Sequence, residues 1–251
     1  NEASRLETPR SIYPLSTISE IKEWCYHEGK TFWEYVSDCE GPEIWDYLDT
    51  VWETMCATIQ RGLNNDGVLP GGLKVARKAS TYWVKSKSYT DSLSSRAKIY
   101  AYALATSEEN ASGGTVVTAP TCGSSGVMPA VLYHLSTSRN FLRIRILRAL
   151  ATAGLFGNVA KTNSSISGAE VGVACAMAAA AACQLFGGTP SQIEYAAEMG
   201  LEHHLGLTCD PVCGLVQVPC IERNAIAAAR AFDANAYATL SDGSHMVSFD
   251  K

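Results

Sequence analysis

The sequence predicts an all-α fold, a compact helical bundle whose loops carry the chemistry. The first observation is a set of three capping boxes, in which a Thr side chain and a Glu or Gln three residues later satisfy each other's free backbone N–H groups; they lie at Thr17–Glu20, Thr31–Glu34 and Thr189–Gln192. The second is two Ala-rich stretches at 171–186 and 221–240, which are typical of closely packed helices. The third is the scarcity of strand character, which is confined to residues 115–118 and is too short for a sheet.

The expected helices follow in chain order. Between 43 and 61 a buried helical face is indicated by apolar residues spaced three and four apart, namely Ile44, Leu48, Val51, Met55 and Ile59. We expect Gly62 and the N-N-D-G cluster at 64–67 to end this helix, and another helix to begin at about Val127. The stretch 171–186 is shorter than the roughly 20 residues of a membrane span and contains Gln184, so a buried helix is favoured. The capping box at Thr189 predicts a helix that reaches about His204 and ends at Gly206.

Composition excludes several classes of protein. Of the 251 residues, 47% are hydrophobic and 18% charged, which indicates a folded core rather than disorder, and we expect one domain over 1–251. A net charge of −5 argues against nucleic acid as a partner. Nine cysteines, an odd number, without a recognisable export signal predict reduced thiols in a cytoplasmic protein. Four of them are expected to fill the core as small apolar residues: Cys25, Cys39, Cys56 and Cys183.

The stretch 203–220 places two histidines and three cysteines within eighteen residues. By spacing alone, Cys209, Cys213 and Cys220 form a C-x3-C-x6-C pattern, and with a histidine they would suit structural zinc in a helical binding or regulatory subunit. Cys220 lies where the 221–240 helix begins, and a helix N-terminus is expected to lower the pKa of a thiol.

Other polar residues suggest a substrate site. The 118–126 loop opens a helix, so its backbone N–H groups predict an anion site, with a tight structural turn as the alternative; the candidates are Thr118, Thr121, Gly123, Ser124 and Ser125. Either His203 or His204 would suit a proton acceptor, although both also fit helix capping. Lys74 fits a carboxylate partner or a solvated side chain. A pyridoxal phosphate enzyme is disfavoured because no strand alternation supports its α/β fold.

Six motifs carry a resemblance to the catalytic region of the iron–sulfur-dependent L-serine dehydratases. They run in the family's order from about Ile21 to the C-terminus and lie at 68–73, 108–114, 117–121, 165–172, 205–211 and 216–225. The resemblance implies an all-helical catalytic domain that deaminates L-serine to pyruvate and ammonia in amino-acid catabolism and gluconeogenesis. It also implies a 4Fe–4S cluster, an α/β (beta) domain or subunit as partner, and a homo-oligomer.

The resemblance further implies the roles of single residues. Cys209 and Cys220 match two cluster ligands, and Cys213 is left out. Ser165, Ser167 and Glu170 flank the position of the third ligand and are expected to contact the cluster or bind substrate. Three cysteines would leave one iron open to take the hydroxyl group of serine as a Lewis acid.

The third ligand cysteine is absent between Glu170 and Val173. The family continues into a C-Q-G-E-V-G segment there, whereas Gly172 runs directly into Val173. We expect an omitted loop, and therefore a chain break near Val171 with Cys209 and Cys220 across a cavity. A continuous peptide would indicate a true deletion and would favour the binding-subunit interpretation.

Overall fold

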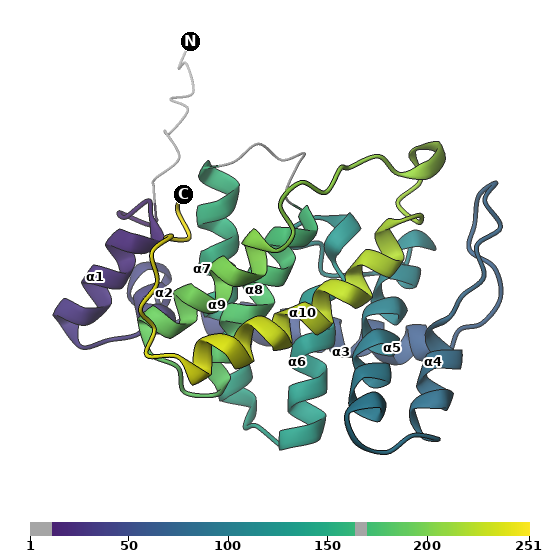
Figure 1. The fold of residues 1–251 in the computed structure, drawn as a ribbon, viewed down its shortest axis with the longest axis horizontal. Coiled ribbons are helices and arrows are strands. Elements are labelled where there is room, and N and C mark those ends of the chain that lie inside the picture. Colours follow the sequence, from purple (N-terminus) through teal and green to yellow (C-terminus); the bar gives the residue numbers. More distant parts are fainter. Residues whose placement is uncertain (1–11, 164–169) are drawn as a thin grey trace, which may run out of the picture.

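A computed structural model describes residues 12–163 and 170–251 of the chain, and in these ranges it is helical without a β-sheet, as the sequence predicts (Figure 1). The helices pack into one bundle, and two short 3-10 turns, η1 and η2, lie in its loops. The described helices are α1 (Ile18–Glu28), α2 (Phe32–Glu40), α3 (Ile44–Leu63), α4 (Ala79–Ser86), α5 (Asp91–Ala111), η1 (Cys122–Ser124), α6 (Val127–Arg139), α7 (Arg143–Asn163), α8 (Glu170–Leu185), α9 (Pro190–Glu202), η2 (Val212–Gly214) and α10 (Cys220–Leu240).

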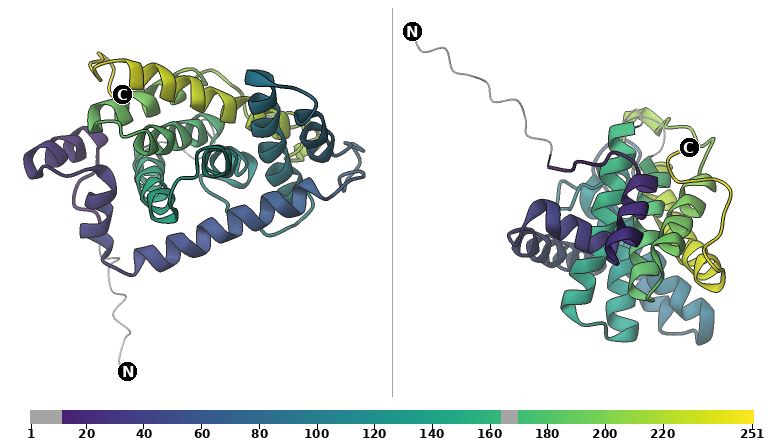
Figure 2. Two further views of the ribbon diagram at one scale, coloured as in Figure 1. Left: turned by 90° about the horizontal axis from the view of Figure 1, so that it is seen from below. Right: turned by 90° about the vertical axis from the view of Figure 1, so that its left-hand side faces the viewer.

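Helix α8 forms the centre of the bundle and contacts α6, α7, α9 and α10. In Figure 2, α7 and α8 lie between α3 on one side and α10 on the other. Residues 172–183 of α8 are buried throughout, which confirms the predicted buried helix. Small side chains permit the close packing: a β-carbon at Gly200 would stand 3.1 Å from the backbone nitrogen of Ala176. None of the described helices is both long enough and apolar enough to span a membrane.

The local signals set the helix ends, with two corrections. All three capping boxes are present. Helix α3 ends at Leu63 with Asn64 of the predicted 64–67 cluster as its C-cap, but Gly62 lies inside the helix. A β-carbon there would lie 2.4 Å from the carbonyl oxygen of Ala105, so this glycine allows α3 and α5 to touch. Helix α9 ends at Glu202, with His203 as its C-cap, two residues before the predicted end.

The predicted core cysteines divide into two groups. Cys25 and Cys183 are fully buried, whereas Cys39 and Cys56 are only partly covered. All nine cysteines fall within the described ranges and all are free thiols, as expected for a reduced protein.

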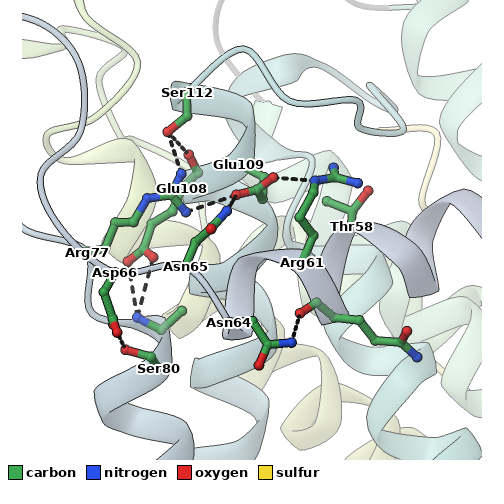
Figure 3. A network of polar contacts seen from close by, with 12 residues as sticks. Thr58, Arg61, Asn64, Asn65, Asp66, Arg77, Ser80, Glu108, Glu109 and Ser112 are labelled. Carbon is green, nitrogen blue, oxygen red and sulfur yellow. Dashed lines mark hydrogen bonds and ion pairs between the residues drawn. The ribbon is translucent and has the colours of Figure 1, made fainter.

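A buried carboxylate network ties α3, α4 and α5 together at the start of the 108–114 motif (Figure 3). Glu109 accepts hydrogen bonds from Arg61 at 2.5 Å, Asn65 at 2.7 Å and Arg77 at 3.0 Å. Glu108 accepts from the backbone nitrogens of Lys78 at 2.6 Å and Ala79 at 3.2 Å, and so satisfies the first free N–H groups of α4. This motif therefore holds helices together.

Candidate active site

Four segments that are distant in sequence line one open depression. They are the η1 turn, the start of α8, the loop between α9 and α10, and the first turn of α10, where the α9–α10 loop arches beside the start of α10 (Figure 1). The residues that line it are Gly123, Ser124, Glu170, Val171, Leu207, Thr208, Cys209, Asp210, Pro211, Pro219, Cys220 and Arg223. Five of them, Gly123, Ser124, Glu170, Cys209 and Cys220, are among the residues predicted from the sequence.

The two predicted cluster ligands face this common space. Cys209 is exposed in the loop, and Cys220 is half-buried as the first residue of α10. Burial and then the nearby charge of Cys209 raise the pKa of the Cys220 thiol, while Arg223 opposes them. The prediction that the helix N-terminus lowers this pKa is therefore wrong in direction, because desolvation of the thiolate is the larger effect.

The η1 turn is held by its own hydroxyl groups. The side-chain oxygens of Thr121 and Ser124 are 3.1 Å apart, and the Ser125 hydroxyl donates to the carbonyl of Cys122 at 2.8 Å. Ser124 and Ser125 are buried, so these contacts shape the turn from within. A β-carbon at Gly123 would lie 3.0 Å from a carboxylate oxygen of Glu170, which shows that this carboxylate lies against the turn.

The start of α8 departs from the sequence-based expectation. The helix runs without interruption from Glu170 to Leu185, through Gly172 and Val173, so the predicted chain break near Val171 is wrong. The predicted approach of this segment to the cysteine loop is confirmed by Glu170 and Val171, which share the depression with Cys209 and Cys220. Ser165 and Ser167 lie outside the described residues.

The histidine pair lies beside the depression without lining it. His203 and His204 each bond through Nδ1 to the carbonyl four residues earlier, at 2.9 and 2.7 Å, so the capping alternative is realised for both. His203 is exposed and lines a different groove, between α5, α9 and α10. His204 is half-buried, and burial lowers its pKa, which favours the neutral ring. Its side chain lies next to Gly172 of α8.

Three further candidates are placed elsewhere. Lys74 is exposed, with a left-handed φ of 51°, and makes no ion pair within the described part of the chain. Thr118 lines a separate groove between α3 and α7. Cys213 and Cys122 are exposed and do not line the depression.

Sequence reasoning missed Asn224 and Arg223, although both stand in the quoted 216–225 motif. Arg223 brings a guanidinium group to the depression and donates to the carbonyl of Thr208 at 2.6 Å. Asn224 is buried beneath it and bonds to the η1 turn. Polar residues three and four positions after a candidate ligand, on a helix that is otherwise Ala-rich, are the signal that could have found them.

The family model for the serine dehydratase alpha chain matches residues 13–251. The chain belongs to this family. It is 49% identical to an L-serine dehydratase of Streptomyces coelicolor over 95% of this chain and 55% of the relative. Identity to L-serine dehydratase 1 of Escherichia coli is 45%, over 95% of this chain and 56% of that protein. The chain thus spans little more than half the length of these relatives.

A third relative matches the whole length of this chain. L-serine dehydratase 2 of E. coli is 42% identical over all of this chain and 58% of its own length, and the match extends over 266 positions against 251 residues here. That relative therefore carries residues with no counterpart in this serine dehydratase alpha chain. Within the described ranges, no three His, Cys, Asp or Glu side chains are grouped closely enough to hold a metal ion.

Proposed function

We propose that this chain is the catalytic part of an L-serine dehydratase that converts L-serine to pyruvate and ammonia. The observation that carries the proposal is the convergence of the η1 turn, Glu170, Cys209 and Cys220 on one depression. Glu170, Cys209 and Cys220 lie in three of the motifs on which the family resemblance rests, and the η1 turn directly follows a fourth, at 117–121. The relatives named above are all L-serine dehydratases. We place the activity in cytoplasmic amino-acid catabolism and gluconeogenesis, with a beta domain or subunit and a second copy of the chain as partners.

The charges around the depression suit a zwitterionic amino acid. The guanidinium group of Arg223 is a partner for the substrate carboxylate, and the N-terminus of α6 adds favourable partial charge behind the η1 turn. The carboxylate of Glu170, which lines the same depression as Arg223, is a partner for the ammonium group. Ser124 and Gly123 then lie beside the substrate, as the sequence predicts.

Among the predicted catalytic residues, His204 is retained as the proton acceptor. Its Nδ1 proton is directed at the Gly200 carbonyl, which leaves the Nε2 lone pair to take a proton. Burial keeps the ring neutral by lowering its pKa, and its neighbour Gly172 adjoins Val171 on the wall of the depression. His203 lines a different groove and Lys74 is exposed outside the lining of the depression, so neither is included.

A 4Fe–4S cluster fits this chain only in part. Cys209 and Cys220 would supply two thiolates, and the cluster would act as a Lewis acid that helps the hydroxyl group to leave. The third thiolate is lacking, since Cys175 is fully buried inside α8 and the other cysteines do not line the depression. The ligand set is therefore incomplete, and no step of the reaction is derived through the cluster.

The alternative function is a helical binding subunit without activity, and it would require a true deletion of the ligand segment. A true deletion of the ligand segment would leave the fold intact, because the core of α8 is formed by residues after Gly172. A structural zinc at Cys209, Cys213 and Cys220 is not supported, because Cys213 does not share the depression. Serine dehydration remains the better-supported proposal because it explains all four walls of the depression.

One insertion separates the two candidates. The full-length protein would be prepared anaerobically as it stands and with the segment CQGEVG inserted between Gly172 and Val173; a matched control carries SQGEVG. We expect iron and sulfide binding, a brown absorbance and conversion of serine to pyruvate in the CQGEVG protein and not in the SQGEVG control, because the inserted cysteine completes the ligand set. Loss of activity in air should follow, because the open iron has no thiolate. If the CQGEVG protein is folded and still binds no iron and forms no pyruvate, the dehydratase proposal is wrong.

A further inference from the structure

Asn224 bonds to three separate backbone groups from a buried position in the first turns of α10. Its Nδ2 group donates to the carbonyls of Gly123 at 2.7 Å and Cys220 at 2.8 Å, and its Oδ1 accepts from the backbone nitrogen of Gly126 at 2.9 Å. A carboxamide has two N–H donors and one carbonyl oxygen, so each is used. The orientation of the amide is also defined, because its partners are two carbonyls and one N–H group.

These three partners belong to two walls of the depression. Gly123 and Cys220 line it directly, and Gly126 is the N-cap of α6 behind the η1 turn. Gly126 has no room to shift toward α5, because a β-carbon there would lie 2.6 Å from the carbonyl oxygen of Ala103. The start of α6 is therefore anchored on α5, and Asn224 connects the Cys220 turn to that anchor.

We propose that Asn224 is a positioning residue that holds the Cys220 turn and the Gly123 segment at a set separation, so that thiol and loop backbone face the same ligand. The identity of that ligand rests on the proposed function, whereas the geometry does not.

No other side chain of this size meets the three partners. Aspartate would place a carboxylate oxygen against two carbonyl oxygens, leucine has the shape without the hydrogen bonds, and glutamine is longer by one methylene group. With leucine, the backbone groups of Gly123, Cys220 and Gly126 lose their partner, which favours local opening of the two walls.

The test compares two asparagines of α10 in the full-length protein. Asn224→Leu removes the bridge. Asn235→Leu is the matched control, because Asn235 is also buried, at 4% exposure, and accepts a hydrogen bond from Thr239 at 3.2 Å far from the depression. The readout is the rate at which iodoacetamide alkylates each cysteine in cluster-free protein at one pH, resolved by mass spectrometry. Cys25, 1% exposed in α1, reports global unfolding.

We expect alkylation of Cys220 to become roughly tenfold faster in Asn224→Leu, as the loss of these hydrogen bonds allows local opening. The rate should be unchanged in Asn235→Leu, and Cys25 should be unchanged in both. In active enzyme, the KM for serine should rise in Asn224→Leu, because the η1 turn is released together with the thiol.

Several outcomes would overturn the proposal. One is that iodoacetamide alkylates Cys220 at the same rate in Asn224→Leu as in the unchanged protein. Another is that Cys25 is also alkylated faster in Asn224→Leu, or that Cys220 is alkylated faster in Asn235→Leu as well. Should Asn224→Leu fail to fold, Asn224→Ser, which keeps one hydroxyl donor, takes its place. If neither Asn224 variant folds while Asn235→Leu does, the role of Asn224 is purely structural and the proposal is wrong. A selective rise at Cys220, combined with a folded CQGEVG protein that has no dehydratase activity, would support the role of Asn224 and reject the proposed function.

Discussion

The carboxylate network of α3–α5 and the cysteine depression are both polar, but they differ in how their groups are satisfied. In the network, Glu109 is 3% exposed and has three side-chain donors, and Glu108 is 1% exposed and caps α4. In the depression, Cys209 and Asp210 are exposed and Cys220 is half-buried. Buried polar groups that have hydrogen-bond partners stabilise a fold, whereas exposed thiols and charged side chains are available to bind a ligand. The two regions should therefore respond to substitution in opposite ways.

The largest effect is expected on activity, from the cysteines. In the CQGEVG protein, Cys209→Ala and Cys220→Ala should each abolish iron binding and turnover, because each removes a thiolate from the cluster. Cys213→Ala is the control and should retain both. Stability should change by less than about 0.5 kcal/mol for the exposed Cys209, as urea denaturation of the cluster-free protein would show. Retained iron in Cys220→Ala, with loss in Cys213→Ala, would reverse the ligand assignment.

The network should respond through stability instead. Burial raises the pKa of Glu109, but hydrogen bonds from Arg61, Asn65 and Arg77 outweigh it and the net pKa is lowered. Glu109→Gln keeps the shape and leaves Arg77, whose side chain is 8% exposed, without its countercharge. We expect a loss of about 3 to 5 kcal/mol in the free energy of unfolding, measured by urea denaturation. A loss below about 1 kcal/mol would mean that the network is not what holds α3, α4 and α5 together.

A pH-dependent effect of intermediate size is expected at Glu198 of α9. Burial, and then the charge of Glu202, raise the pKa of Glu198 to about 7. A carboxyl whose pKa is higher in the folded state binds more protons there, so its contribution to stability is complete below its unfolded pKa and is lost as pH rises toward 7. Glu198→Gln should abolish this loss and raise stability at pH 8 by about 1 kcal/mol, allowing for solvent screening.

Thermal unfolding of both proteins between pH 4 and pH 8 would measure this difference. The curves should converge at the acidic end, where Glu198 is protonated. A constant gap across the whole range would instead indicate a packing effect of the substitution.

The smallest effect is expected for an ion pair between the two regions. Lys78 and Glu222 are joined at 2.5 Å, but their side chains are 45% and 69% exposed. Exposed pairs contribute little because water and salt screen them, so Glu222→Gln should change stability by less than about 0.5 kcal/mol. It is the surface counterpart of Glu109→Gln in the same denaturation experiment. A comparable loss in both variants would show that burial does not explain the difference.

The sequence by itself determined the helical class and most helix starts. Thr17, Thr31 and Thr189 cap helices through contacts within four residues, and such signals need no tertiary structure to be read. Sequence patterns also identified five residues that the depression brings together: Glu170, Cys209 and Cys220 lie in family motifs, and Gly123 and Ser124 lie in the 118–126 loop. These patterns could not exclude Thr118 or Lys74 from the site, because a sequence pattern does not show where each residue lies relative to the depression.

Only the tertiary structure decided the rest, because it depends on groups far apart in the chain. The role of Asn224 rests on a bond to Gly126, 98 positions earlier, and Gly62 is explained by the backbone of α5 rather than by its own helix. The raised pKa of Cys220 also depends on tertiary structure. The sequence shows that Cys220 begins a helix, but the burial that raises the pKa of its thiol comes from residues packed around it.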